Sequence, residues 1–507
     1  MREIGPLGKA DKPIRWLLTI WALSGIMLAV AAGLLYLRWD GFSEQGEVTF
    51  SAVSWLLYKG CPLYTALDAA DRYSLQHGPN IYLVIGGVMK LLGPSYMTAK
   101  LANVLALFLV ILFSWLWLSK LVKKQDALWL VGLESWLLLH WHYSFAARPD
   151  SLMLLCVTVS MYIVTTARNR LLIILGTGIS LGLIINLKVH GIFYLLPIIL
   201  IAYQQLNRRS LVAIAAVAMS VAIGPFLLPQ VSFVNYMLWL TQSAHMGISL
   251  GNVLAKVVLV FELSMIGVAV GVIGKINLRR FYQQHRTIIL ILLGSLIVPA
   301  IVGSKPGSGT NHLMPYIPVY IYIMSLLAAD IRAKTGERAG LIRTRLAINL
   351  SRAFLIALLI LVTISGVGKS ISLIKPKSNG DRAAVIQELL SIEKLYSGMT
   401  MEVGYGEERS LQAYRDYAVL LVFHGNPYLV DKVALGDMRG TGLPVPDATI
   451  DKVKEGAVKI WLIPADNTPF AIHEFDESFR EAFFQNYRLT ARTRYFDIWI
   501  HYNNPSN

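Results

Sequence analysis

The sequence predicts an all-α membrane domain that crosses the bilayer about eleven times and is followed by a small α/β domain. Hydrophobic residues make up 55% of the 507 residues, charged residues make up 15%, and the mean hydropathy is +0.54. This composition is too apolar and too poor in charge for an ordinary soluble protein. The apolar residues form blocks of about 17 to 25, the length at which a helix crosses a hydrocarbon core of ~30 Å. From Ile374 onward the pattern is that of a soluble domain.

Each apolar block is expected to form a membrane-spanning helix. The first block should remain as a helix, because its apolar core is longer than the ~7–15 residues of a signal peptide and no A-x-A-like site precedes Arg38. Residues 1–373 thus form the expected membrane domain, and residues 374–507 the expected extracytoplasmic domain. The predicted spans are residues 16–37, 95–118, 127–145, 151–167, 171–187, 191–205, 210–229, 253–273, 287–302, 313–329 and 353–373.

Basic residues gather on one side of these spans, for example in the loops 119–126 and 206–209. Cytoplasmic loops carry the excess of Lys and Arg, so the N-terminus is predicted to be cytoplasmic. The odd number of spans then places the first loop and the C-terminal domain outside the plasma (inner) membrane of a cell envelope. That domain has 15 Lys and Arg against 18 Asp and Glu, a net charge of −3. Since the whole chain carries +15, residues 1–373 carry +18. The basic residues are scattered and lack interleaved aromatic residues, which argues against nucleic-acid binding.

The first outer loop contains an acidic stretch, residues 38–82, in an otherwise basic chain. Its two apolar segments, residues 46–58 and 80–92, are too short to span the bilayer. We expect them to lie as helices on the membrane surface, where they would cover the entrance of a cavity. The loop carries five carboxylates, which belong to Asp40, Glu44, Glu47, Asp68 and Asp71.

Two further outer loops place charged side chains next to the membrane. Arg148-Pro149-Asp150 starts a helix, since proline favours the first helical position. Asp150 either complements the helix N-terminus, with Arg148 as its ion partner, or faces a site. Lys188 and His190 lie near membrane depth, where a cation is costly unless it faces a polar cavity or an anion. The alternative is a lysine whose ammonium reaches back to the interface.

The last outer loop combines glycines, which allow close approach of a ligand, with polar side chains. Lys305 adds a cation there, and Asn311 and His312 open a helix. The order of residues is not that of a P-loop, so nucleotide binding is not expected. Residues 230–252 form an amphipathic outer connection that could act as a lid.

Helical and strand patterns alternate in the C-terminal region, which indicates a small α/β domain. It shows no nucleophile motif and no metal-ligand spacing, so we expect a packing role. The predicted helices are residues 383–396 and 479–487, and the predicted strands are residues 401–406, 458–464 and 493–503.

All of the charged side chains singled out above fall on the outer face. A secondary transporter would instead carry ionisable residues near the middle of the bilayer, in broken helices arranged as repeats. One-sided placement favours an enzyme that acts on a lipid-borne substrate. The chemistry that fits is displacement at a sugar anomeric carbon with a lipid phosphate as leaving group. A carboxylate would take the proton of an acceptor hydroxyl, and Lys and Arg would stabilise the charge on the phosphate.

The order and sidedness of these motifs resemble the GT-C glycosyltransferases, in particular the branch of bacterial aminoarabinose transferases and protein mannosyltransferase-like proteins. The resemblance covers residues 1 to about 373. It implies a polyprenyl-phosphate-sugar donor, a glycan, lipid or protein acceptor, transfer at the outer leaflet, and an acidic base in the first loop. The motifs that carry it are the acidic first loop, His77-Gly78-Pro79, Arg148-Pro149-Asp150, the loop with Lys188 and His190, and the segment GSKPGSGTNHLMP.

The family commonly has an Asp-Glu pair in the first outer loop, whereas this chain has Asp40-Gly41 and then Glu44-Gln45-Gly46-Glu47. Distance from the membrane helix favours Asp40 as the base, and spacing from the Gly60 to Tyr64 turn favours Glu44 or Glu47. Some branches use a divalent metal, for which the acidic loop offers oxygen ligands; no other cofactor is implied. By resemblance, Arg148, Lys188 and Lys305 bind the donor phosphate, and His77, Asp150, His190, Asn311 and His312 bind or orient the substrate.

Two alternatives to an enzyme stay open. A transporter or flippase for a lipid-linked glycan would move substrate without forming glycosidic bonds. A non-catalytic relative would bind polyprenyl phosphate only, and its phenotype would not depend on the acids of the first loop.

Overall fold

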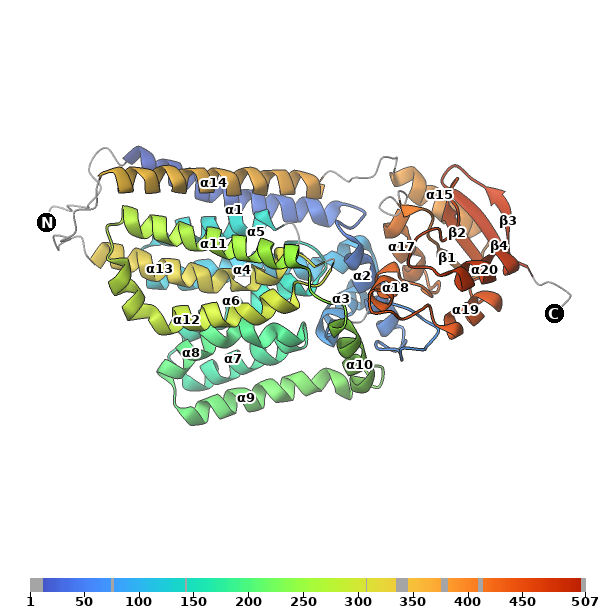
Figure 1. Cartoon of the computed structure of the whole chain (residues 1–507), viewed down its shortest axis with the longest axis horizontal. Coiled ribbons are helices and arrows are strands. Elements are labelled where there is room, and N and C mark those ends of the chain that lie inside the picture. Colours follow the sequence, from blue (N-terminus) through green and yellow to red (C-terminus); the bar gives the residue numbers. More distant parts are fainter. Residues whose placement is uncertain are drawn as a thin grey trace.

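The computed structural model describes residues 12–73, 77–141, 144–306, 308–333, 345–374, 382–408 and 414–502. Figure 1 shows long helices lying side by side along the longest axis of the molecule, and a smaller domain with the strands at one end of this bundle. Helices α2, α3 and α10 lie between the bundle and the smaller domain (Figure 1). The molecule is therefore a helical membrane part with a mixed-sheet domain attached at one end.

Every apolar block predicted to span the membrane forms a helix. Eight described helical segments are long and apolar enough to cross a bilayer; two of them, residues 208–227 and 310–333, join a helix to a 3-10 turn. Helices α5, α7 and α8 are shorter, with 17, 16 and 14 residues. The bundle helices are α1 Lys12–Arg38, α4 Tyr96–Leu121, α5 Lys124–His140, α6 Pro149–Thr166, α7 Arg170–Ile185, α8 Ile192–Gln205, α9 Arg208–Ile223, α11 Leu250–Ile273, α12 Leu278–Val302, α13 Ile317–Ala333 and α14 Arg345–Ile374. Short 3-10 turns η3 Val189–Gly191, η4 Gly224–Leu227 and η5 Thr310–Tyr316 connect some of them.

The first outer loop contains the two short helices expected from its apolar segments, α2 Gln45–Tyr58 and α3 Pro79–Leu92. They pack against each other, and α2 also packs against α17 of the C-terminal domain. Residues 47–54 of α2 are consecutively buried, which differs from the expected helix lying open on a membrane surface. The reason is that the C-terminal domain covers the face of α2 that the sequence pattern alone leaves exposed. The amphipathic connection 230–252 contains α10 Phe233–Ala244.

The C-terminal domain is built on a four-stranded sheet with the order β1-β2-β4-β3. Strands β1 and β2 are parallel, and the other pairs are antiparallel. The sequence patterns predicted β1, β2, β4, α15 and α20, and missed β3 and three helices of six to eight residues. The elements are α15 Arg382–Leu395, β1 Met401–Val403, η8 Arg415–Tyr417, α17 Ala418–Phe423, α18 Lys432–Arg439, α19 Asp447–Lys454, β2 Ile460–Pro464, α20 Glu477–Asn486, β3 Tyr487–Arg492 and β4 Phe496–His501.

Backbone and side-chain hydrogen bonds attach this domain to the first outer loop. Arg72 donates its amide to the carbonyl of Leu429 at 2.8 Å and accepts from the amide of Asp431 at 2.7 Å. The Thr49 hydroxyl of α2 donates to the Asp431 carboxylate at 2.8 Å. Burial lowers the pKa of the Arg72 guanidinium to about 10, and the charges of Asp68 and Asp71 act against this shift. Asp68 and Asp71 of the first loop therefore lie near the contact between Arg72 and the C-terminal domain.

A second contact lies where α1 runs into the first loop. The carboxylate of Asp416 accepts a hydrogen bond from the amide of Phe42 at 3.1 Å and pairs with Arg382 at 3.2 Å. Tyr96, in the first turn of α4, donates its hydroxyl to the Asp416 carbonyl at 2.9 Å. Both ends of the first loop are thus held by the C-terminal domain, which gives this domain the packing role expected from its sequence.

Gly78 should be required for the fold, because a Cβ at this position would lie 2.1 Å from the carbonyl oxygen of Asn186. We expect Gly78→Ala to lower the free energy of unfolding by about 1–3 kcal/mol, the usual cost of overpacking, measured as a lower melting temperature in detergent. Gly87 of α3 has open space around its Cβ position, so Gly87→Ala is the matched control and should not lower the melting temperature. Equal melting temperatures for the two variants would contradict the close approach.

Candidate active site

The start of α6 forms the centre of a charged cluster. Pro149 occupies the first helical position, and Arg148 is the N-cap residue in extended conformation, as the sequence pattern predicted. The Asp150 carboxylate contacts Arg148 Nε at 3.3 Å through Oδ2 and Lys188 Nζ at 2.8 Å through Oδ1. Asn311 of η5 donates to the same Oδ1 at 3.2 Å. The structure thus brings together four of the predicted site residues.

The cluster is buried at one end and partly open at the other. The Asp150 and Lys188 side chains are 0% and 5% exposed. Arg148 is 18% exposed and donates through Nη1 to Glu44 at 2.6 Å; the Glu44 side chain is 17% exposed. Since a buried carboxylate between two cations is well compensated, Asp150 is an internal counter-ion. The Arg148–Glu44 end is the part that a ligand can reach.

Backbone bonds hold the His77-Gly78-Pro79 segment against the loop that carries Lys188. The amide of Gly78 donates to Leu187 at 3.2 Å, and the amide of Asn80 donates to Asn186 at 3.1 Å. The His77 ring meets Phe50 of α2 edge-on, with centroids 4.9 Å apart. Burial, and next the positive charges of Lys188 and Arg148, hold the pKa of His77 well below its usual range. His77 is therefore a neutral imidazole beside the cluster.

His190 and His312 form a pair of imidazoles beside Lys188. Their ring centroids are 5.5 Å apart, and Tyr194 of α8 donates its hydroxyl to the His312 carbonyl at 2.8 Å. Nε2 of His190 and Nδ1 of His312 are buried and make no hydrogen bond with any described residue. Buried polar atoms normally have partners, so these two nitrogens are available to a polar ligand.

The three acids predicted as the base occupy different environments. Glu47 is 0% exposed and accepts from the Ala147 amide, the Ser43 amide and the Ser43 hydroxyl, each at 2.7 Å. Burial, together with the nearby Glu44 carboxylate, raises the pKa of Glu47. Asp40 is exposed, and its carbonyl accepts from Arg382. Of the three, Glu44 is the one that contacts the cluster, while Glu47 ties α2 to the loop before α6.

Lys305 lies apart from the other two predicted phosphate ligands. Its ammonium donates to the Ser243 hydroxyl at the end of α10, and its carbonyl accepts from Asn252 of α11 at 2.8 Å. Burial lowers the pKa of Lys305. The structure therefore connects Lys305 to the amphipathic connection rather than to Asp150.

Two supporting residues were missed from the sequence. Lys100 is 0% exposed, and its ammonium donates to the carbonyls of Tyr36 at 2.6 Å and Gly41 at 3.2 Å, where it caps the end of α1. The Asn103 amide donates to the Arg148 carbonyl and to the Ser151 hydroxyl. Both residues lie inside a predicted span, and the signal that could have found Lys100 is a lysine near the start of an apolar helix.

In the described part of the acidic first loop, no three His, Cys, Asp or Glu side chains lie close enough to share an ion. Among the described residues, the one group of three His, Cys, Asp or Glu side chains close enough to share an ion is Glu408, His473 and Glu474. This group belongs to the C-terminal domain, where the sequence spacing predicted none.

Asp150→Asn should destabilise the protein strongly, because it leaves Arg148 and Lys188 without their buried counter-charge. Breaking a buried ion pair costs about 3–5 kcal/mol, so we expect a clearly lower melting temperature. Asp451 forms an exposed pair with Lys454 at 2.9 Å, and Asp451→Asn should change the free energy of unfolding by no more than about 1 kcal/mol. Thermal unfolding of both variants in one detergent checks this, and an equal loss in both would contradict the assigned role of Asp150.

Comparison with known proteins finds similarity in structure only. The sequence matches no protein-family model and no curated protein. ArnT from Cupriavidus metallidurans bound to undecaprenyl phosphate superposes with a TM-score of 0.55 at 14% identity, covering 95% of this chain and 98% of that chain. The apo state of the same protein gives a TM-score of 0.56 at 13% identity with the same coverage. An Archaeoglobus fulgidus oligosaccharyltransferase tethered to an acceptor peptide gives 0.48 at 11% identity, covering 87% of this chain and 69% of that chain.

The similarity to ArnT extends over nearly the whole of both chains, so it includes the C-terminal sheet domain as well as the helical bundle. It confirms the resemblance that the sequence motifs predicted. The chain has the fold of ArnT.

Proposed function

We propose that this protein transfers a sugar from a polyprenyl-phosphate-linked donor to an acceptor hydroxyl at the outer face of the plasma membrane. The observation that carries the proposal is the cluster in which Arg148 and Lys188 flank Asp150 and Glu44 lies at the open end. This arrangement offers cations to a phosphate and a carboxylate to a hydroxyl. The fold supports it, since the ArnT structure with the same architecture holds undecaprenyl phosphate.

The proposed topology has eleven spans, with the N-terminus in the cytoplasm. Helices α5, α7 and α8 complete the count, because each packs against a longer apolar helix: α5 against α1, α7 against α6, and α8 against α12. Residues 1–373 form the catalytic membrane domain, and residues 374–507 form the extracytoplasmic domain. The distribution of basic residues supports this orientation, which places the cluster on the outer side.

The donor phosphate binds at the Arg148 end of the cluster. Two cations and two carboxylates make the cluster neutral as it stands, and the Arg148–Glu44 pair is its exposed part. A phosphate oxygen competes with Glu44 for the guanidinium, which binds phosphate through parallel N–H donors. Lys188, fixed by Asp150, adds positive potential from the buried side. Phosphate binding therefore releases the Glu44 carboxylate.

The released Glu44 carboxylate acts as the general base. It takes the proton of the acceptor hydroxyl while the new bond forms between the acceptor oxygen and the anomeric carbon. The bond between the anomeric carbon and the phosphate oxygen breaks, and polyprenyl phosphate leaves with the electron pair. Arg148 and Lys188 stabilise the negative charge on the leaving group. His77, His190, Asn311 and His312 line the same region and contact the sugar.

Glu44→Gln should reduce sugar transfer by a factor of about 10²–10⁴, the usual contribution of a general base. The measurement is transfer of radiolabelled sugar from synthetic polyprenyl-phosphate donors to membrane acceptors, with polyprenyl phosphate binding measured in parallel. Binding should persist, because the cations remain.

Asp40→Asn is the matched control, since Asp40 is an exposed acid of the same loop, and it should keep full transfer. Loss of transfer in Asp40→Asn with retention in Glu44→Gln would assign the base to Asp40 instead. If the wild type binds the lipid phosphate but transfers no sugar from a broad donor panel, the protein is a transporter or a binding protein.

Lys188→Met and Arg148→Gln should each weaken binding of undecaprenyl phosphate about tenfold to a hundredfold, because a hydrogen bond to a charged group contributes about 1.5–3 kcal/mol. Lys90→Met is the control: this lysine is exposed on α3 and stacks on Tyr58 at 4.6 Å, so binding should not change. Equilibrium binding of the labelled lipid in detergent checks the prediction. Equal affinities for the wild type and both cluster variants would show that the phosphate does not bind at this site.

A further inference from the structure

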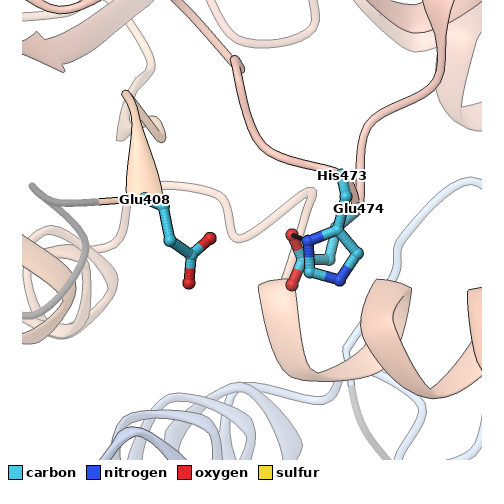
Figure 2. A group of neighbouring side chains, drawn as sticks. All are labelled: Glu408, His473 and Glu474. Atoms are coloured by element: carbon cyan, nitrogen blue, oxygen red, sulfur yellow. Dashed lines mark ion pairs between the residues drawn. The ribbon is translucent and has the colours of Figure 1, made fainter.

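We propose that Glu408, His473 and Glu474 of the C-terminal domain bind one divalent transition-metal ion such as Zn²⁺. Each residue offers one ligand atom, and these atoms all lie within 4.8 Å of one another. Figure 2 shows the Glu408 carboxylate directed across a gap toward the imidazole of His473 and the carboxylate of Glu474. One imidazole and two carboxylates are a ligand set that suits Zn²⁺.

Glu408 is far in sequence from the adjacent His473 and Glu474, and the fold of the sheet domain brings them together. Glu408 follows β1, whereas His473 and Glu474 lie between β2 and α20. The His473 Nδ1 atom lies 3.2 Å from Glu474 Oε2. This separation in sequence explains why no ligand spacing was visible in the amino-acid pattern.

The buried carboxylate of Glu474 points independently to a cation. Glu474 is 6% exposed, and its Oε2 atom accepts no hydrogen bond from any described residue. A buried charged oxygen without a hydrogen bond is costly unless it is paired or coordinates a metal. The partner groups reach it from solvent, since the His473 and Glu408 side chains are each 69% exposed. A metal ion can therefore enter from outside and satisfy this oxygen.

Lys432 forms an ion pair with each of the two carboxylates when no metal is bound. Its ammonium lies 3.4 Å from Glu408 Oε1 and 3.4 Å from Glu474 Oε1, and Oε2 of Glu474 is left facing His473. A divalent ion repels this ammonium, and the flexible lysine stem allows it to move away. Lys432 is therefore a competitor of the metal, and this competition separates a metal site from a cluster of ion pairs.

The site borders a cavity. Glu474 also lines a cavity of about 300 Å³ together with Arg439, Leu443 and Asp476. Zn²⁺ with three protein ligands keeps at least one position for water or another ligand. The proposed ion would thus lie in the wall of this cavity, and it belongs to a different part of the molecule from the Asp150 cluster.

The test measures zinc bound to the purified full-length chain after equilibrium dialysis against buffered Zn²⁺, by elemental analysis. The wild type should hold about one more zinc ion per chain than His473→Ala or Glu474→Gln, as a three-ligand site requires. His424→Ala is the matched control, because His424 forms a comparable His–Glu pair with Glu393 at 2.7 Å in the same domain. This variant should keep the wild-type zinc content.

Lys432→Met should raise the affinity for Zn²⁺ about tenfold, since it removes a positive charge next to the ion. Melting temperatures verify that each variant is folded, and His473 is exposed enough that its truncation should not unfold the domain. Equal zinc content in the wild type, His473→Ala and Glu474→Gln would overturn the proposal. So would an unchanged or lower affinity in Lys432→Met, which would leave the group as ion pairs neutralised by lysine.

Discussion

The candidate site depends on one buried carboxylate, that of Asp150. It is fully buried, pairs with Arg148 and Lys188, and accepts a hydrogen bond from Asn311. Without it, Lys188 would lose its buried counter-charge and Arg148 would keep its pair with the partly exposed Glu44, and a buried cation without a counter-charge is costly. Because its partners come from the start of α6, from the loop after α7 and from η5, this single group also fixes three segments of the chain relative to one another.

The acidic end of the cluster depends on a different framework. Glu44 is the N-cap residue of α2, and the neighbouring Glu47 fixes the start of that helix by accepting from Ala147, one residue before Arg148. The C-terminal domain covers the outer side of α2 and holds the first loop through Arg72 and Asp416. Precise placement of a site carboxylate requires such support, so the domain contributes to the candidate site without containing any of the cluster residues.

Much of the fold could be predicted, and the reasons for the misses are physical. Long apolar blocks, and strands such as 458–464, can be recognised from their own residues. Strand β3, Tyr487–Arg492, was missed although its burial alternates, because it is a short edge strand whose charged residues look like a loop. Lys100 was read as part of an apolar span, because sequence does not show the three carbonyls at the end of α1 that its ammonium caps.

The sequence by itself determined the membrane character, the helical segments and the gathering of Arg148, Asp150, Lys188, Asn311 and the histidines on one face, since hydropathy and charge sidedness are local properties of the chain. Tertiary structure decided which of these residues touch. It paired Glu44 with Arg148, tied Glu47 to the amide of Ala147, placed Lys305 against Ser243 of α10, and gathered Glu408, His473 and Glu474. Contacts between residues distant in sequence depend on how helices and strands pack, and no local pattern encodes that geometry.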